Sequence, residues 1–202
     1  MIIAVFDWAR GSPLNFMEFR WMKDKAVINA WGRFFGEMHQ ISRKFSKDHP
    51  EIAKRIQNWD QIHCAILAGT KLHPDDLAVI DDPNHFGVLH GDLNCSNIYY
   101  VDDGDYLSVY DTDQVQRGFY LFDLAQACVT LPMLAEGGLP VVGTPVEGVD
   151  PKFFMDTLVG GYESTGEKVD MDRLNRMVDI KKQLYVKFAK RAFKEGNIPK
   201  DM

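Results

Sequence analysis

Cysteines are few in this sequence, and long apolar runs are absent from it. The only cysteines among 202 residues are Cys64, Cys95 and Cys128, with no CxxC pair, so neither a disulfide framework nor a zinc knuckle is indicated. The first apolar run, residues 1–6, ends at Asp7, lacks a basic leading region and is too short for a signal peptide or a membrane span. We therefore expect a cytoplasmic protein with no membrane partner.

Positive charge is also in deficit. Lys and Arg number 23 against 29 acidic residues, which gives a net charge of -6. This balance gives a nucleic-acid or anionic-membrane partner no electrostatic support and mildly favours a cationic small molecule. Basic residues recur near the C-terminal end, where we expect them to form the solvated face of a long helix: Lys181, Lys182, Lys187, Lys190, Arg191 and Lys194.

Hydrophobic periodicity predicts a mostly helical α+β fold. Apolar residues three and four positions apart indicate helices over residues 24–45, 119–134, 151–164 and 171–195, with weaker helical segments over 50–59 and up to about 68. Gly32 and Gly36 on the first helix predict close approach of a neighbour. Residues 98–101 and 106–110 are rich in β-branched and aromatic side chains and flank Asp-Asp-Gly-Asp, which predicts a hairpin.

The polar residues around this hairpin carry the chemistry. His90, Asp92 and Asn97 form an HxDxxxxN pattern before the first strand, and Asp111 follows the second strand, so the hairpin returns it to the same end. In kinase-like phosphotransferases this Asp accepts the proton of the acceptor hydroxyl, and the Asn oxygen ligates a metal. The Asp111 carboxylate is the hard oxygen ligand that Mg²⁺ prefers.

Two other readings of these residues stay open. His90, Asp92, Asn97, Asp111 and Asp113 can be read as the mixed metal site of a hydrolase, although the nearest second histidine is His85 in a loop. The chain can also be a noncatalytic module, derived from a kinase-like lobe, that binds a small molecule or a partner. Binding of nucleotide and Mg²⁺ discriminates this second reading from a phosphotransferase.

Three segments together resemble the aminoglycoside phosphotransferase and choline kinase-like family. They are LHGDLNCSN, VYDTDQVQRGFYLFDLA and WGRFFGEMHQIS, and the likeness covers nearly the whole chain. It implies the C-terminal lobe of the protein kinase-like fold, with ATP and Mg²⁺ as cofactors. It further implies transfer of the γ-phosphate to a hydroxyl of a small molecule of the aminoglycoside, amino alcohol or sugar type.

The resemblance also implies roles for individual residues. Asp92 would be the catalytic base, Asn97 and Asp111 the Mg²⁺ ligands, Asp123 a buried residue that hydrogen-bonds the catalytic loop, and His90 a structural residue. The segment VFDWARG would be the hinge, where Asp7 and Ala9 read the adenine edge beneath Phe6, with Tyr99 and Tyr110 as the floor. Thr112 and Gln114 depart from the family pattern, which puts metal affinity or loop packing in doubt.

The same resemblance implies that half of the site is missing. Residues 1–13 would be the hinge strand and linker and residues 14–202 the helical catalytic lobe, with no N-terminal lobe before them. The sequence contains no GxGxxG or Walker A motif, and its glycine pairs at 137–138 and 160–161 lack a following Lys-Ser or Lys-Thr. We therefore expect a truncated phosphotransferase, or one whose site a second chain completes, that is weak or inactive as this chain alone. Its apolar first strand is expected to pair with a second copy of the chain.

Overall fold

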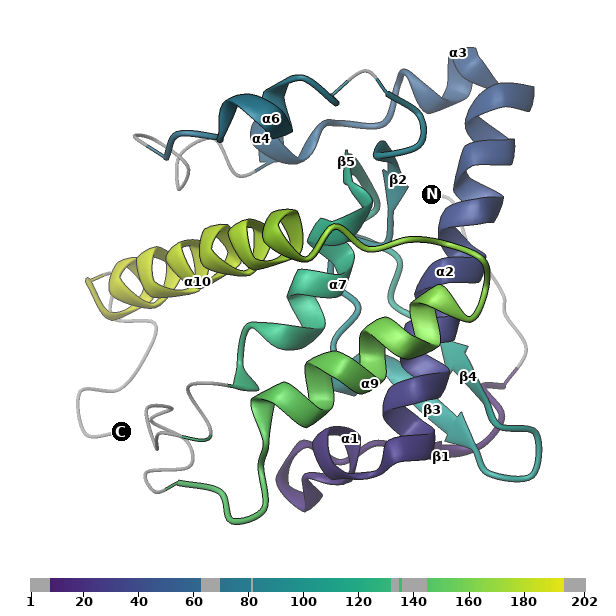
Figure 1. The fold of residues 1–202 in the computed structure, drawn as a ribbon, viewed down its shortest axis with the longest axis vertical. Coiled ribbons are helices and arrows are strands. Elements are labelled where there is room, and N and C mark those ends of the chain that lie inside the picture. The colour runs from purple at the N-terminus through teal and green to yellow at the C-terminus, as the bar shows by residue number, and fades with distance from the viewer. Residues whose placement is uncertain (1–7, 63–69, 81, 132–134, 136–144, 195–202) are drawn as a thin grey trace, which may run out of the picture.

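The structure is a computed structural model, shown as a ribbon in Figure 1. It describes residues 8–62, 70–80, 82–131, 135 and 145–194, and side chains in the last range as far as Lys187. The helices are η1 (Phe16–Glu18), α1 (Arg20–Lys23), α2 (Lys25–Asp48), α3 (Pro50–Ala53), α4 (Trp59–Ile62), α6 (Pro74–Leu77), η2 (Cys95–Asn97), α7 (Tyr120–Cys128), α9 (Pro151–Glu163) and α10 (Met171–Lys194). The strands are β1 (Ser12–Pro13), β2 (Phe86–Leu89), β3 (Ile98–Val101), β4 (Tyr106–Val109) and β5 (Gln116–Phe119).

The strands form two small antiparallel sheets, of order β1-β3-β4 and β2-β5. Strands β3 and β4 confirm the predicted hairpin. At the end of the expected hinge strand and linker, Ser12 and Pro13 pair with Tyr100 and Tyr99 of β3. The β2-β5 ladder was not predicted, because β5 reads Gln-Arg-Gly-Phe and shows no apolar alternation. Its glycines, Gly87 and Gly118, face each other in the ladder.

Helices α2 and α9 lie along each other (Figure 1) and build one half of the core. Asp24 caps α2 by accepting a hydrogen bond from the amide of Ala26 at 2.9 Å. A Cβ on Gly32 would lie 1.9 Å from the Leu158 carbonyl oxygen, and one on Gly36 would lie 2.3 Å from Thr165 Oγ1. The predicted close approach at these two glycines is therefore confirmed, because no larger residue fits between the helices.

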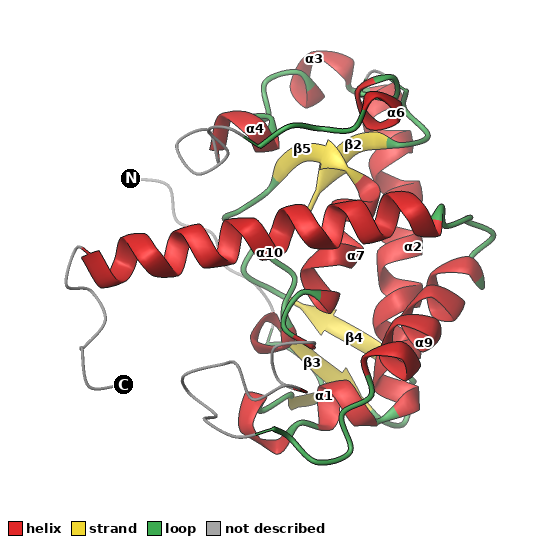
Figure 2. Ribbon diagram, turned by 60° about the vertical axis from the view of Figure 1, so that its left-hand side comes forward, coloured by secondary structure: helices red, strands yellow, loops and turns green. Residues whose placement is uncertain are grey.

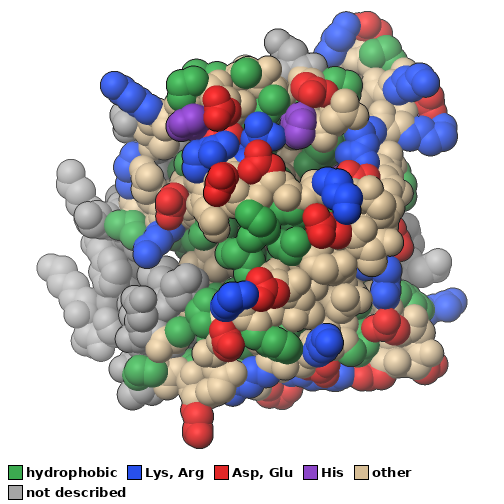
Figure 3. All heavy atoms as spheres, in the orientation of Figure 1, with side chains coloured by type: hydrophobic (Ala, Val, Ile, Leu, Met, Phe, Trp, Pro, Cys, Tyr) green, Lys and Arg blue, Asp and Glu red, His purple; other side chains and the backbone are tan. Residues whose placement is uncertain are grey.

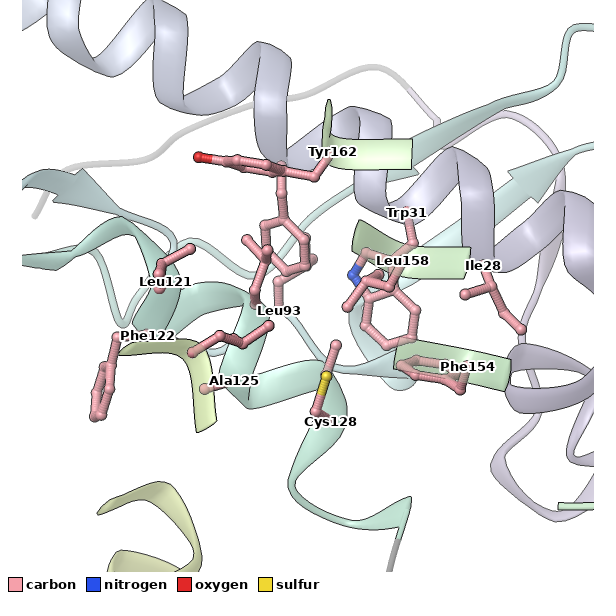
Figure 4. Packing of buried hydrophobic residues seen from close by; sticks show 14 of the residues in the cluster. Ile28, Trp31, Leu93, Leu121, Phe122, Ala125, Cys128, Phe154, Leu158 and Tyr162 are labelled. Atoms are coloured by element: carbon pink, nitrogen blue, oxygen red, sulfur yellow. The ribbon is translucent and has the colours of Figure 1, made fainter. Parts of the chain in front are cut away.

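Aromatic side chains fill the space between these helices and α7. Figure 4 shows Trp31 beside Phe154 and Leu158, with Phe122 and Cys128 contributed by α7. The rings of Trp31 and Phe154 meet edge to face, with centroids 6.1 Å apart. Burial of such large apolar rings is the main term that holds the helices of this half together.

Helix α10 crosses over α7, with the β2-β5 sheet on one side and the β3-β4 hairpin on the other (Figure 2). It is held at its first turns by a buried carboxylate from α6. Asp76 Oδ1 accepts from Arg173 Nε at 3.0 Å and from Arg176 Nη2 at 2.7 Å. The short helix α6 therefore contributes a buried carboxylate to an ion-pair network that fixes α10.

Some predicted helices are shorter in the structure. Residues 50–62 form only the single turns α3 and α4, and α7 ends at Cys128, while residues 63–69 and 132–134 lie outside the described part. None of the helices that the structure describes is long and apolar enough to cross a membrane. On the face shown in Figure 3, acidic and basic side chains are interspersed and form no continuous basic patch.

Candidate functional site

The loop after β2 is fixed by one buried carboxylate from α7. Asp123 is fully buried, and its two oxygens accept hydrogen bonds from the backbone amides of His90, at 3.0 Å, and Gly91, at 2.9 Å. Gly91 adopts a positive φ of 86°, and a Cβ there would lie 2.2 Å from the Gln114 carbonyl oxygen. Only glycine suits this tight, left-handed position. The sequence HGD therefore folds into a loop whose backbone is held before Asp92.

Asp123 keeps its negative charge despite its burial. Burial alone would raise its pKa, but the hydrogen bond from His39, the amide of Gly91 and the charge of Lys181 outweigh it and lower the pKa. His39 Nε2 lies 3.4 Å from Asp123 Oδ2, and His39 Nδ1 lies 3.1 Å from the Tyr162 hydroxyl. Burial lowers the pKa of His39, so the neutral ring donates from Nε2 to the carboxylate and accepts from Tyr162 at Nδ1.

The carboxylate of Asp92 is half-buried and oriented by a glutamine. Gln126 Nε2 donates to Asp92 Oδ1 at 3.0 Å and to the Tyr185 hydroxyl at 2.8 Å, so both of its N–H groups are used. Burial raises the pKa of Asp92, and this effect outweighs the opposing charge of Lys181. A positioned carboxylate with a raised pKa is a stronger base than an ordinary aspartate.

The hairpin brings Asn97 and Asp111 to the same end, as the sequence predicts. Asn97 is buried, and its Nδ2 donates to the Asp92 carbonyl oxygen at 2.8 Å, which fixes the side-chain amide. The amide of Tyr110 donates to the Asn97 carbonyl oxygen at 3.2 Å, closing the base of the hairpin. Asp111 follows immediately, with a positive φ of 63° and an exposed side chain.

His90 connects the loop to this end of the hairpin. Its Nε2 lies 3.3 Å from the carbonyl oxygen of Tyr110, and the residue is buried. Its Nδ1 is buried and has no hydrogen-bond partner among the described residues. This placement suits a residue that supports the loop, because its one bonded nitrogen contacts backbone next to Asp111.

A cavity of about 450 Å³ opens beside Asp92. Asp92 and Asp111, which the sequence singled out, both line it, and α7 and α10 supply one wall. Its lining residues are Gly91, Asp92, Asp111, Asp113, Gln114, Gln116, Gln126, Lys181, Leu184 and Tyr185. The structure therefore joins two of the predicted site residues in one ligand-sized space.

Sequence reasoning missed Gln126, Tyr185 and Lys181. Lys181 was expected on the solvated face of the last helix, but it is buried, with 4% of its surface exposed, and it lines the cavity. It stands three and four residues before Leu184 and Tyr185, which line the same cavity, so one stripe of α10 faces the site. That spacing is the one signal in the sequence that could have revealed it.

The structure describes three of the five residues expected to contact adenine, namely Ala9, Tyr99 and Tyr110. Phe6 and Asp7 lie outside the described residues, and Ala9 lies in the irregular segment before β1. The rings of Tyr99 and Tyr110 meet edge to face with centroids 5.4 Å apart, and the Tyr110 hydroxyl donates to the Ser96 carbonyl oxygen. Neither tyrosine lines the cavity beside Asp92.

The hydrolase reading depends on His85 joining His90. Instead, His85 Nδ1 lies 3.2 Å from Arg173 Nη1, and its Nε2 lies 3.8 Å from Asp82. In the part of the chain that the structure describes, no group of three or more His, Cys, Asp or Glu side chains is arranged to hold a metal ion. The geometry therefore does not favour a metal site built from histidines and carboxylates alone.

No protein-family model matches the sequence, and no curated protein matches it. Among solved structures, the chain is similar to amicoumacin kinase hAmiN in complex with AMP-PNP, Ca²⁺ and Ami. The TM-score is 0.66 at 16% sequence identity, and the match covers 96% of this chain and 59% of that chain. At this identity the likeness shows a shared fold, so the predicted kinase-like fold is confirmed, while the predicted family stays a prediction. This chain thus spans about three fifths of the length of the amicoumacin kinase chain.

Proposed function

We propose that this chain is a kinase-like phosphotransferase that transfers the γ-phosphate of ATP to a hydroxyl of a small molecule. The observation that carries the proposal is the bonding of Asn97. Its side-chain amide donates to the carbonyl oxygen of Asp92, and its backbone carbonyl oxygen accepts from the amide of Tyr110. These bonds tie the candidate base, the candidate metal ligands and the hairpin into one unit. The shared fold with amicoumacin kinase supports the same reading.

In the proposed reaction, Asp92 accepts the proton of the acceptor hydroxyl as its oxygen attacks the γ-phosphorus. The new bond joins the acceptor oxygen to phosphorus, the bond from phosphorus to the β,γ-bridging oxygen breaks, and ADP leaves with that electron pair. Gln126 holds the Asp92 carboxylate, and Asp123 holds the loop that carries it. Protein groups here mostly orient the reactants, which is the main demand of phosphoryl transfer.

The donor set fits Mg²⁺. The Asn97 Oδ1 and Asp111 carboxylate oxygens would hold it, and Asp111 has no hydrogen-bond or ion-pair partner in the described part of the chain. Mg²⁺ is commonly held by one or two protein oxygens together with phosphates and water, so a full protein cage is not needed. When bound, the ion would offset the charge of the phosphates.

The remaining parts of the proposal rest on the sequence. Phe6, Asp7, Ala9, Tyr99 and Tyr110 would contact the adenine, and the acceptor would be a small hydroxyl compound such as an aminoglycoside, an amino alcohol or a sugar. A cytoplasmic location and pairing of two copies through the N-terminal strand belong to the same proposal. Low activity of the chain alone is expected, because the sequence has no glycine-rich phosphate loop.

Calorimetric titration of ATP with Mg²⁺ into the purified chain tests the proposal. The titration is repeated with Asp111→Ala and with Asp103→Ala, which removes an exposed carboxylate from the hairpin turn. We expect binding by the wild type and by Asp103→Ala, and loss of the metal-dependent part in Asp111→Ala. Equal binding by all three proteins, or no binding by the folded wild type, would leave a noncatalytic module as the better account.

A further inference from the structure

The ammonium group of Lys181 is buried without an ionic partner. Its Nζ lies 3.4 Å from the Gly91 carbonyl oxygen, a long hydrogen bond, and 3.9 Å from the centre of the Phe122 ring. None of the ion pairs found among the described residues involves Lys181, although Asp92 and Asp123 are near enough for their charges to act on it. An ammonium has three N–H donors, so most of its capacity is unused.

A buried, unpaired cation is unfavourable unless something else compensates its charge. A leucine or methionine in this position could cover Phe122 without that cost. Burial lowers the pKa of Lys181 to about 8, so the group still carries its charge at neutral pH. The charge is therefore present, desolvated and without an ion-pair partner in the described structure.

The cavity gives this charge access to a ligand. Lys181 is the one cation among the described residues that line it, and the carbonyl it contacts belongs to Gly91, directly before the candidate base Asp92. The other charged lining residues are acidic: Asp92, Asp111 and Asp113. An anion that enters this cavity would therefore be attracted by Lys181 and repelled by the three carboxylates.

We infer that Lys181 is the anion-binding group of this cavity and that the anion it binds is the phosphoryl group in transfer. The inference rests on the proposed function and adds a residue from α10 to its site. In the reaction above, Lys181 Nζ would donate to an equatorial oxygen of the γ-phosphoryl group while Asp92 takes the acceptor proton. The Lys181 ammonium neither gains nor loses a proton in this step. Its positive charge stabilises the negative charge that develops on the phosphoryl oxygens.

The test measures metal-free binding of pyrophosphate by ³¹P NMR titration in the presence of a chelator. The full chain is compared with Lys181→Met, which keeps the length of the side chain without its charge, and with Lys181→Arg, which keeps the charge. Lys182→Met is the matched control, because Lys182 is exposed on the same helix. We expect about tenfold or greater weakening in Lys181→Met, partial recovery in Lys181→Arg and no change in Lys182→Met.

Two further arms separate the inference from its alternatives. Acetate replaces pyrophosphate in one arm, and a preference of Lys181 for acetate would overturn the phosphoryl assignment in favour of a carboxylate. Asp111→Ala is the other arm, and it should keep metal-free pyrophosphate binding while losing binding of ATP with Mg²⁺. A wild type that binds pyrophosphate through Lys181 but does not bind ATP with Mg²⁺ would sink the kinase proposal and leave the anion site.

Equal pyrophosphate affinity in wild type and Lys181→Met would overturn the inference, as would no binding by the folded wild type. Thermal unfolding of each variant shows whether it is folded before titration. If Lys181→Met fails to fold, the Lys181→Arg and Lys181→Gln variants replace it, and the expected order of affinity is wild type, then Arg, then Gln.

Discussion

Lys181 and Asp123 bind the same residue of the candidate catalytic loop through its two backbone polar groups. Lys181 Nζ donates to the carbonyl oxygen of Gly91, and Asp123 Oδ1 accepts from the amide of Gly91. The two side chains come from α10 and α7, which cross each other. The position of Asp92 is thus set by the packing of two helices rather than by its own loop alone.

Replacing Asp123 by asparagine should destabilise the fold. The amide has one acceptor oxygen where the carboxylate has two, so a buried N–H of His90 or Gly91 would lose its partner. We expect a loss of about 2 kcal/mol or more in the free energy of unfolding, measured by urea denaturation. Asp103→Asn, at an exposed position, serves as the control and should leave the midpoint unchanged.

Asp92→Asn should abolish phosphoryl transfer while leaving nucleotide binding nearly intact. The amide cannot accept the proton of the acceptor, and loss of a general base costs about 10²- to 10⁴-fold in rate. The measurement is the turnover of an identified acceptor alongside calorimetric titration of ATP with Mg²⁺. Turnover by Asp92→Asn equal to that of the wild type would remove Asp92 from the proposed role.

Gln126→Leu tests whether orientation of Asp92 matters. The variant removes the N–H groups that bond Asp92 and Tyr185, but it keeps the bulk of the side chain. We expect kcat to fall about tenfold or more with little change in KM for ATP, because the carboxylate loses its orientation before attack. A change confined to the KM for ATP would indicate a role in nucleotide binding instead.

The ion-pair network at Asp76 should make stability depend on pH. Burial alone would raise the pKa of Asp76, but the hydrogen bonds and charges of Arg176 and Arg173 outweigh it and lower the pKa. A carboxyl group whose pKa is lowered by folding stabilises the protein fully at a pH above its pKa in the unfolded chain, about 3.9. This stabilisation is lost as the pH falls through the lower pKa of the same group in the folded protein. Asp76→Ala should cost about 3–5 kcal/mol at pH 7.

Urea denaturation of wild type and Asp76→Ala at pH 7 and in steps below pH 4 measures this effect. The difference between the two proteins should shrink as the pH falls, because protonated Asp76 no longer pairs with the arginines. A difference that stays constant across this range would show that the contribution of Asp76 is not electrostatic.

Two glycines of the α2–α9 contact region form a matched pair. A Cβ on Gly32 would lie 1.9 Å from the Leu158 carbonyl oxygen, whereas one on Gly160 would meet nothing within 4 Å. Gly32→Ala should therefore destabilise the protein by about 1–3 kcal/mol, because α9 must move away. Gly160→Ala should stabilise it by about 0.5–1 kcal/mol, since alanine favours the helix. Thermal unfolding that ranks the two variants in the opposite order would contradict this packing.

Local patterns in the sequence determined much of the fold. The three-and-four spacing of apolar residues gave α2, α9 and α10, because a helix with one buried stripe needs that spacing. The Asp-Asp-Gly-Asp turn between two apolar runs gave the β3–β4 hairpin, and through it the placement of Asn97 and Asp111 at one end. These features depend on neighbours in the chain, so the sequence alone contains them.

Only the tertiary structure decided what surrounds Asp92. Its neighbours in the cavity come from α7 and α10, which begin about 30 and 80 residues after Asp92 in the chain: Gln126, Lys181 and Tyr185. No local sequence pattern determines the angle at which α10 crosses α7. The same holds for the β2–β5 ladder and for the ion pairs of Asp76, whose partners are 97 and 100 residues away. Charge on a helix predicts exposure on average, but whether one lysine faces water or a cavity depends on the element packed against it.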